Sequence, residues 1–322
     1  MTSKKKIIIS LFLFFLCAIY AGNASWLRMA PNGNATLLAH RGVHQTFPVS
    51  RVRYDTCTAK IIDESGHKYI ENTHDSIRAA FSFGASVVEL DIRATQDRHF
   101  AVFHDDQLDC RTNGGGPLNE RSLKYLQSLD IAYGYTFDEG KSFPLRGSGI
   151  AKMPSLRSVL DTYPEKKFLL HLKNGSTREA DLLIPLLASL SKEQQQKLMI
   201  YGADNSVSKV LSQLPEMKGY TRSSIKKCLV SYALLGWSGY VPNPCRNKLL
   251  QIPKNYAPYF WGWPRAFMSR MDEVDTQIIL TGDYDQFSSG IDDISSFNEL
   301  TKDYKGMIWT NKIELLGPHL HE

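Results

Sequence analysis

The chain has 322 residues, of which 43% are hydrophobic and 22% charged, and its formal net charge is +5. This composition excludes a disordered chain, and it suits one large domain as well as two ordinary ones, since a single (β/α)8 barrel needs about 250 residues. No basic stripe interleaved with aromatic residues is present, so we expect no nucleic-acid partner, and no feature of the sequence points to a partner protein.

The N-terminus has the pattern of an export segment. Residues 4–6 are lysines, Ile7 to Ala21 is an apolar run, and small residues at 22–24 occupy the usual cleavage positions of a signal peptide. The run is shorter than the roughly 20 apolar residues that span a membrane. We therefore expect residues 1–24 to be a signal peptide in preference to an uncleaved membrane anchor, and the protein to be periplasmic, secreted or anchored to a membrane.

Four cysteines remain if this leader is removed, namely Cys57, Cys110, Cys228 and Cys245. An even number in an exported chain favours disulfides, and three connectivities are open. We prefer the sequential pairing, Cys57–Cys110 and Cys228–Cys245, and the alternative is four buried free thiols.

Short apolar strands alternate with helices along the rest of the chain. Strands are predicted at 35–39, 86–92, 100–103, 168–172, 198–201, 277–281 and 306–310, and helices at 73–83, 122–129, 155–161, 181–190 and 206–214. The connection 43–70 is long, and the segment 231–267, rich in Trp, Tyr, Pro and Gly, is expected to be an ordered loop or insertion. The alternation predicts βαβ units, and polar residues at strand ends favour one TIM (β/α)8 barrel over residues 35–318, with inserted segments after the first strand and late in the barrel.

The strand at 86–92 carries two carboxylates on one face. Glu89 and Asp91 point to the side opposite Val88, Leu90 and Ile92, and their Cα atoms are about 7 Å apart. Two negative charges directed into a barrel repel each other, and a hard divalent cation such as Mg²⁺ or Ca²⁺ would relieve that repulsion. The alternative is an exposed edge strand with solvated acids.

Two histidines follow apolar runs and are candidates for acid–base chemistry. His40 follows the first predicted strand, and His104 ends the run at 100–103, so in a barrel we expect both at the same rim. Phosphodiester cleavage needs a base for the nucleophile and an acid for the leaving oxygen, and imidazole serves both at neutral pH. Arg41 could bind a phosphate through two hydrogen bonds, the alternative being a surface ion pair.

Taken in order, these residues resemble the glycerophosphodiester phosphodiesterase family. The matching motifs are Ala39-His40-Arg41-Gly42, Glu71-Asn72-Thr73, Glu89-Leu90-Asp91, Val102-Phe103-His104-Asp105, Leu108-Asp109-Cys110-Arg111-Thr112, Met153-Pro154-Ser155-Leu156 and Ile308-Trp309-Thr310-Asn311. They span nearly the whole chain after the leader. The resemblance implies a TIM barrel that hydrolyses glycerophosphodiesters to glycerol 3-phosphate and an alcohol, in lipid or glycerol metabolism.

The resemblance also implies roles for individual residues. It implies that His40 and His104 are the general acid–base pair and that Arg41 and Lys173 hold the phosphate. The implied ligands of one divalent metal are Glu71, Glu89 and Asp91, with Ca²⁺ or Mg²⁺ expected before Mn²⁺ or Zn²⁺.

Two departures from the family pattern stand out. His171 occupies the position, two before the lysine, where the family commonly has a glutamate ligand, and an imidazole there would favour transition metals or Zn²⁺. Between Gly42 and Glu71 lie 28 residues, which is long for the family, and a bond from Cys57 to Cys110 would hold this loop over the active site.

Three readings of the function follow. The substrate is a small-molecule phosphodiester in the first reading and a lipid phosphodiester, cleaved by a phospholipase D-like or lysophospholipase D-like barrel, in the second. The third is a non-catalytic exported binding protein. Trp237, Trp261 and Trp263 could wall a pocket for a larger alcohol or simply pack in loops, and the N-terminal segment could associate with a membrane.

Overall fold

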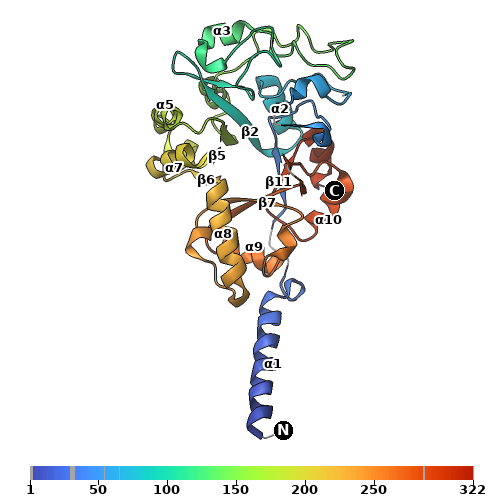
Figure 1. Cartoon of the computed structure of the whole chain (residues 1–322), viewed down its shortest axis with the longest axis vertical. Helices are drawn as coiled ribbons and strands as arrows, with labels where there is room; N and C mark the ends of the chain where they lie inside the picture. The colour runs from blue at the N-terminus through green and yellow to red at the C-terminus, as the bar shows by residue number, and fades with distance from the viewer. Residues whose placement is uncertain (1–2, 30–32, 54, 65, 286, 322) are drawn as a thin grey trace.

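The structure, a computed structural model, describes residues 3–29, 33–53, 55–64, 66–285 and 287–321. Within them, eight parallel strands form a nearly closed barrel (Figure 1). Its strands are β1 Thr36–Ala39, β2 Ala85–Ala94, β4 Lys167–Leu172, β5 Leu198–Gly202, β6 Lys218–Thr221, β7 Leu249–Pro253, β8 Gln277–Thr281 and β11 Met307–Thr310. The hydrogen-bonded order is β6-β5-β4-β2-β1-β11-β8-β7. The TIM-barrel prediction is confirmed.

Helices lie between the strands along the chain, and most of them cover the outside of the barrel. They are α2 His74–Ser82, α3 Leu123–Ser128, α4 Leu156–Thr162, α5 Thr177–Ala188, α6 Lys192–Gln196, α7 Asp204–Gln213, α8 Arg222–Leu235, α9 Arg265–Asp272, α10 Ile294–Thr301 and α11 Ile313–Leu316. The helix predicted at 73–83 is α2, whose first turn is capped by Thr73 and Ser76 in a reciprocal capping box. A small hairpin, β9 Tyr284–Asp285 with β10 Phe287–Ser288, lies outside the barrel sheet.

The barrel interior is filled by one side chain from each strand. This layer consists of Leu38, Val87, Leu169, Met199, Tyr220, Leu249, Ile279 and Trp309. The alternate residues Val88, Leu90 and Ile92 belong instead to the larger core between the sheet and the helices, as the alternation of strand side chains requires. The interior is therefore a packed core, and functional groups must lie above this layer at the carboxyl ends of the strands.

The run at 100–103 reaches the rim by a different route from the one expected. It forms β3 Phe100–Val102, which pairs antiparallel with β2 and is not a barrel strand. The connection from Ala94 to Phe100 is too short for the crossover that a parallel neighbour needs, so the chain turns back as a hairpin. His104 is consequently brought back beside Asp91, and the Phe103 N–H donates to the Asp91 carbonyl at 2.9 Å.

The segment 231–267 is not one continuous insertion, because it contains the end of α8, strand β7 and the start of α9. Neither β6 nor β7 was predicted, because each has only four or five residues and contains a glycine or a proline.

The structure contains the two disulfides of the sequential pairing, Cys57–Cys110 and Cys228–Cys245. The first joins the long loop after β1 to the segment that follows His104. The second ties α8 to the turn before β7.

The N-terminal segment forms helix α1, Ser3–Asn23, which projects away from the barrel on the side of α8 and α9 (Figure 1). By length and composition its residues Lys4–Asn23 could cross a membrane, and a signal sequence would have the same properties.

Candidate active site

The polar residues of the site continue the interior rows of the barrel strands. On β2, Val87 belongs to the interior layer, Glu89 lies two residues further along the strand, and Asp91 lies two residues beyond Glu89. The same step leads from Leu169 to His171. On β1 and β11 it leads from Leu38 to His40 and from Trp309 to Asn311. Because side chains alternate along a strand, this register brings the polar groups together at the carboxyl end of the barrel.

A turn at Arg41-Gly42 places the arginine over the carboxylates. Arg41 has a φ of 55° and Gly42 one of 77°, both in the left-handed region. A Cβ on Gly42 would lie 2.7 Å from the Ser76 Oγ and 2.9 Å from its backbone, so only glycine fits. The turn is held because the Arg41 N–H donates to Glu89 Oε2 at 3.1 Å and the Arg41 carbonyl accepts from the Asn72 N–H at 2.9 Å.

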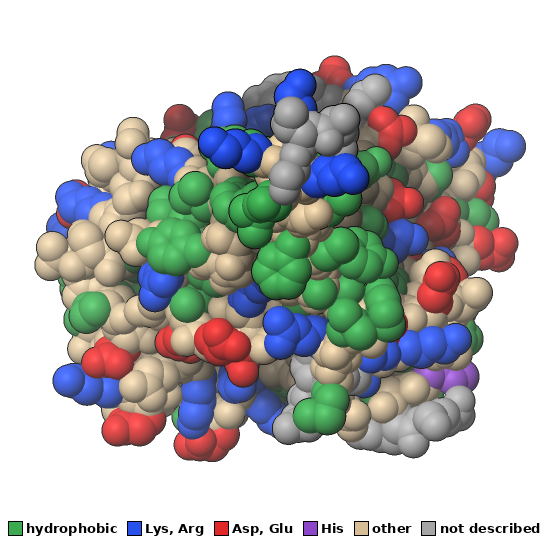
Figure 2. All heavy atoms as spheres, turned by 90° about the horizontal axis from the view of Figure 1, so that it is seen from below, with side chains coloured by type: hydrophobic (Ala, Val, Ile, Leu, Met, Phe, Trp, Pro, Cys, Tyr) green, Lys and Arg blue, Asp and Glu red, His purple; other side chains and the backbone are tan. Residues whose placement is uncertain are grey.

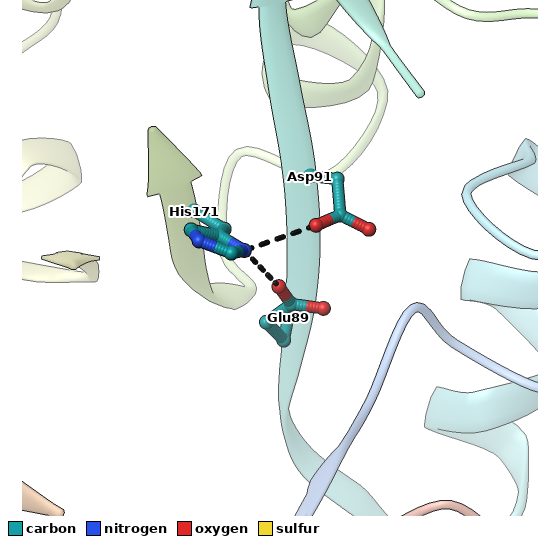
Figure 3. A group of neighbouring side chains, drawn as sticks. All are labelled: Glu89, Asp91 and His171. Atoms are coloured by element: carbon teal, nitrogen blue, oxygen red, sulfur yellow. Dashed lines mark hydrogen bonds and ion pairs between the residues drawn. The ribbon is translucent and has the colours of Figure 1, made fainter. Parts of the chain in front are cut away.

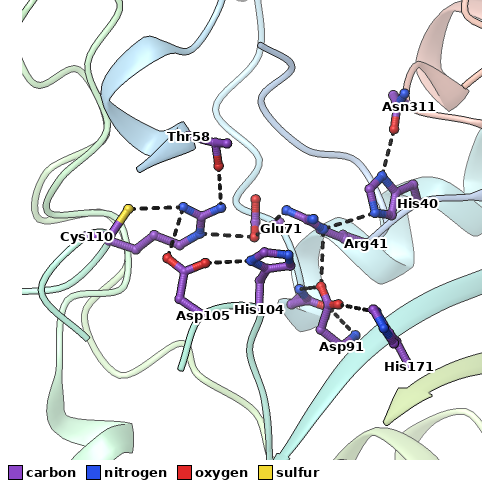
Figure 4. A network of polar contacts seen from close by, with 12 residues as sticks. His40, Arg41, Thr58, Glu71, Asp91, His104, Asp105, Cys110, His171 and Asn311 are labelled. Carbon is purple, nitrogen blue, oxygen red and sulfur yellow. Dashed lines mark hydrogen bonds and ion pairs between the residues drawn. The ribbon is translucent and has the colours of Figure 1, made fainter. Parts of the chain in front are cut away.

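His40 is held in one orientation as a neutral imidazole. Its Nδ1 lies 2.7 Å from Asn311 Oδ1, and its Nε2 accepts from Arg41 Nε at 3.1 Å (Figure 4). The Nδ1 atom must therefore carry the ring proton. Burial, together with the neighbouring Arg41 charge, holds the pKa of His40 well below its usual range. Asn311 is itself fixed by Asp292, which accepts from its side-chain amide at 2.8 Å.

His104 is held by a carboxylate instead of an amide. Its Nδ1 lies 2.5 Å from Asp105 Oδ1, and the other oxygen of Asp105 lies 3.3 Å from Arg111 NH1 (Figure 4). Burial, and then the Arg41 charge, hold the pKa of His104 well below its usual range. A bound phosphodiester would offset the Arg41 charge, and Asp105 would then favour the protonated imidazole.

Glu89, Asp91 and His171 form the group best suited to hold a metal ion. Their ligand atoms all lie within 4.8 Å of one another (Figure 3). His171 Nδ1 is 3.1 Å from Asp91 Oδ1 and 3.7 Å from Glu89 Oε1. The imidazole stacks on Tyr201 with ring centroids 4.1 Å apart, and the Tyr201 hydroxyl donates to Glu89 Oε1 at 2.9 Å.

The two buried carboxylates differ in charge state. Burial and the Asp91 charge raise the pKa of Glu89 to about 8. Burial opposes ionisation of Asp91 as well, but Lys173, at 3.4 Å, and Arg41 keep its pKa well below the usual range. A divalent cation would reverse the penalty on Glu89, because it favours the charged form. Two carboxylates and a neutral imidazole, with a pKa near 4 at His171 because of its burial, therefore fit such an ion.

Glu71 is not grouped with these ligand atoms in the structure. Its Oε1 accepts from Arg41 NH1 and from Arg111 Nε, both at 3.2 Å. Burial opposes ionisation, but the two arginines outweigh it and lower the pKa of Glu71 to about 2. Glu71 thus orients Arg41 in this structure.

Several residues of the site had no assigned role from the sequence. Asp105 and Arg111 lay within recognised motifs, yet their ion pair depends on how the loop folds back. Asn311 and Tyr201 were visible as the polar residues ending β11 and β5, and period-two counting from the interior layer would have placed both at the rim.

A cavity of about 990 Å³ opens beside His104 and Lys173. Its lining includes both residues of the Cys57–Cys110 disulfide, as well as Arg93 and Glu179. The tryptophans Trp237, Trp261 and Trp263, for which a pocket wall and simple packing were both open, do not line this cavity. Trp237 lies against α1, and Trp263 packs against Phe267 and Tyr304 in the core.

Comparison with known proteins shows which family this chain is similar to. The sequence profile of the glycerophosphoryl diester phosphodiesterase family matches residues 40–207, just over half of the chain. A putative glycerophosphodiester phosphodiesterase of Bacillus subtilis, YhdW, is 37% identical over 100 residues, or 31% of this chain and 37% of that protein. A glycerophosphodiester phosphodiesterase of Caldanaerobacter subterraneus is 27% identical over 152 residues, or 46% of this chain and 59% of that protein. The chain thus matches between about a third and three fifths of these relatives' lengths.

Solved structures share the fold at lower identity. The glycerophosphoryl diester phosphodiesterase domain of a Mycobacterium tuberculosis protein superposes with a TM-score of 0.64 at 14% identity, covering 89% of this chain and 99% of that one. An Oleispira antarctica phosphodiesterase, solved in complex with the product sn-glycerol-3-phosphate, superposes with a TM-score of 0.56 at 16% identity, covering 90% and 98% of the two chains.

Proposed function

Because this chain belongs to the glycerophosphoryl diester phosphodiesterase family, we propose that it hydrolyses glycerophosphodiesters to glycerol 3-phosphate and an alcohol. The observation that carries the proposal is the pair of oriented imidazoles, His40 and His104, on either side of Arg41 and above the Glu89–Asp91 carboxylates. Arg41 and Lys173 supply positive charge where a phosphate would lie between them.

The two histidines divide the proton transfers between them. His40 donates from Nδ1 to a neutral amide, so its other nitrogen is the natural base for the attacking hydroxyl, which comes from water or from the glycerol moiety itself. His104, paired with the Asp105 carboxylate, is the natural acid for the departing alkoxide. When Arg41 turns its guanidinium to the phosphate, it gives up contacts with His40 and frees the base.

We assign the divalent ion to Glu89, Asp91 and His171, with Glu71 as a fourth candidate. Such an ion, when bound, would polarise a phosphoryl oxygen and offset charge in the transition state. The imidazole of His171 makes Mn²⁺ or Zn²⁺ as suitable as Ca²⁺ or Mg²⁺. We take residues 35–318 as the catalytic domain, and the two disulfides support an exported location.

The test is a substrate panel assayed after chelation and re-addition of Ca²⁺, Mg²⁺, Mn²⁺ or Zn²⁺. We expect metal-dependent release of glycerol 3-phosphate from glycerophosphocholine or glycerophosphoethanolamine, with the His104→Ala protein as the inactive control. Turnover of lysophospholipids alone would establish the lysophospholipase D-like reading. Inactivity on both classes with every metal would leave the non-catalytic binding protein.

A further inference from the structure

The end of helix α1 is built into the folded domain by a buried arginine. Arg270, on α9, is 9% exposed and donates to the Gly22 carbonyl and to the Asn23 Oδ1, both at 2.9 Å. The Asn23 amide in turn donates to the Trp237 carbonyl at 2.8 Å. The carbonyls that end a helix lack partners within it, so Arg270 caps α1. Cleavage after Ala24 would remove both of these acceptors.

The body of α1 touches little of the protein. The apolar segment Lys4–Asn23 is 0% buried and has a mean hydropathy of 1.9 over its most apolar window. An exposed apolar helix of this length has no stable place in water. Its three lysines at positions 4–6 mark the end that stays in the cytoplasm, and the disulfide-bonded barrel lies at the other end.

The apolar stretch within α1 is shorter than the hydrocarbon core of a bilayer, although the whole helix is long enough to cross a membrane. The 15 residues from Ile7 to Ala21 cover about 22 Å at ~1.5 Å per residue, against a hydrocarbon core of ~30 Å. A short apolar stretch is accommodated by thinning of the bilayer, by snorkelling of flanking residues such as the three lysines, or by oligomerisation. The shortfall is roughly 8 Å, and thinning of the bilayer around α1 would bring the protein surface next to this helix to the level of the interface.

That surface is apolar and aromatic. We call it the α1-flanking surface, and it consists of Trp26, Leu27, Met29, Leu234, Leu235 and Trp237. Trp26, Met29 and Leu234 are 69%, 93% and 68% exposed. The Trp237 ring lies 5.9 Å from that of Phe15 on α1, so the surface is continuous with the helix. Seen from below, hydrophobic side chains gather at the centre of the view, with lysines and arginines as well as aspartates and glutamates around them (Figure 2).

Charged and amphipathic residues occur in the order expected at a membrane interface. On α8, Lys226 and Lys227 come two turns before Leu234 and Leu235, and all four are exposed. Arg28 is exposed among the apolar residues 26–29. Tryptophan and tyrosine favour the headgroup layer, and Tyr20 near the end of α1 is 65% exposed. The basic groups would lie at the level of anionic headgroups.

We propose that residues 1–24 are retained as a membrane anchor and that the α1-flanking surface lies in the outer interface of the same bilayer. This differs from the cleaved signal favoured by the sequence, and the difference rests on the Arg270 cap and the apolar surface, which only the folded chain brings together. The segment with α3, which follows His104 at the cavity, lies at the end opposite α1 (Figure 1). The mouth of the active site therefore faces away from the bilayer.

The test uses the full chain, expressed with its own N-terminus and reconstituted into vesicles of phosphatidylethanolamine and phosphatidylglycerol. Intact-mass measurement should show a chain that begins before residue 25. Lipids brominated near the headgroup should quench much of the tryptophan fluorescence, and Trp26→Phe with Trp237→Phe should remove most of that quenching. A mature chain that begins at residue 25, or tryptophans that the brominated lipids leave unquenched, would overturn the proposal.

A matched pair of variants separates docking from anchoring. Leu234→Glu should at least halve the quenching while α1 stays inserted, because a charge on the surface opposes its entry into the interface. Ile150→Glu changes an aliphatic residue of similar exposure, 59% against 68%, within the segment between His104 and α4, and should leave the quenching unchanged. Equal quenching in both variants would show that the barrel stands clear of the bilayer. Both readouts are independent of turnover, so an inactive enzyme would leave this result intact.

Discussion

The Cys57–Cys110 disulfide closes 53 residues of chain, and its removal is expected to destabilise the protein strongly. In the chain-entropy account, a bond with this separation removes about 4 kcal/mol of conformational freedom from the unfolded state. The Cys228–Cys245 bond has a separation of 17 and gives about 3 kcal/mol by the same account. The double variants Cys57→Ser/Cys110→Ser and Cys228→Ser/Cys245→Ser should therefore both lose stability, the first somewhat more.

Activity should separate the two variants more sharply than stability does. Cys110 precedes Arg111, which is 1% exposed and holds both Glu71 and Asp105. Without the first disulfide this segment loses its covalent tie to the loop after β1, and Asp105 should hold His104 less firmly. We expect kcat to fall in the first variant under conditions where it remains folded, and to change little in the second.

Urea unfolding followed by circular dichroism gives the free energies, and turnover of glycerophosphocholine below the unfolding transition gives the activity. Mass mapping of the non-reduced wild-type protein comes first, because a free Cys57 would show that the Cys57–Cys110 bond is absent. A stability loss under 1 kcal/mol in the first variant would refute the entropic estimate. An equal fall of kcat in both variants would refute the link through Arg111.

Other substitutions test individual residues of the site. His40→Ala and His104→Ala should each abolish turnover while the thermal unfolding curve stays close to that of the wild type, and residual wild-type activity in either would remove the acid–base assignment. Glu89→Gln should weaken metal binding in a calorimetric titration, and an unchanged isotherm would exclude it as a ligand. Arg111→Ala should cost about 3–5 kcal/mol in urea unfolding, because it removes a buried cation that pairs with both Glu71 and Asp105. His171→Glu should tighten metal binding and raise the KM for a glycerophosphodiester, because it adds a negative charge beside the substrate phosphate. A lower KM would contradict this reasoning.

The predictable part of the fold came from strand alternation. Side chains alternate along a strand, so Glu89 and Asp91 were predicted on the face opposite Val88 and Leu90. The structure has this arrangement, because Val87 points into the barrel and Val88 and Leu90 point toward the helices. The short strand β6, Lys218–Thr221, could not be predicted from its own residues, since its lysine and glycine mask the pattern. The segment is a strand because its backbone pairs with β5 in the barrel sheet.

The site could be predicted as far as residues lie on strands. His171 lies beside Asp91 because both residues are on regular β strands whose register pairs their Cα atoms. The ion pairs of Arg111 with Glu71 and Asp105 join three loops, and no local pattern fixes how loops approach one another. The end of α1 is a similar case, because Arg270 is 247 residues from Asn23 in sequence.

The charge balance of the site bears on His171, which occupies the position where the family resemblance implies a glutamate. The ion-pair network around the histidines contains the acids Glu71, Glu89, Asp91 and Asp105 and the bases Arg41, Arg111 and Lys173, and Arg93 lies beside it. One negative charge is in excess within this network when every carboxylate is ionised, and repulsion by Asp91 adds to burial, the larger cause, in raising the pKa of Glu89. A divalent ion would turn the balance to a single positive charge, which complements the single negative charge of a phosphodiester. A glutamate at position 171 would neutralise that positive charge. Compared with a glutamate, the neutral imidazole binds the metal less strongly and leaves the site more attractive to the anionic substrate.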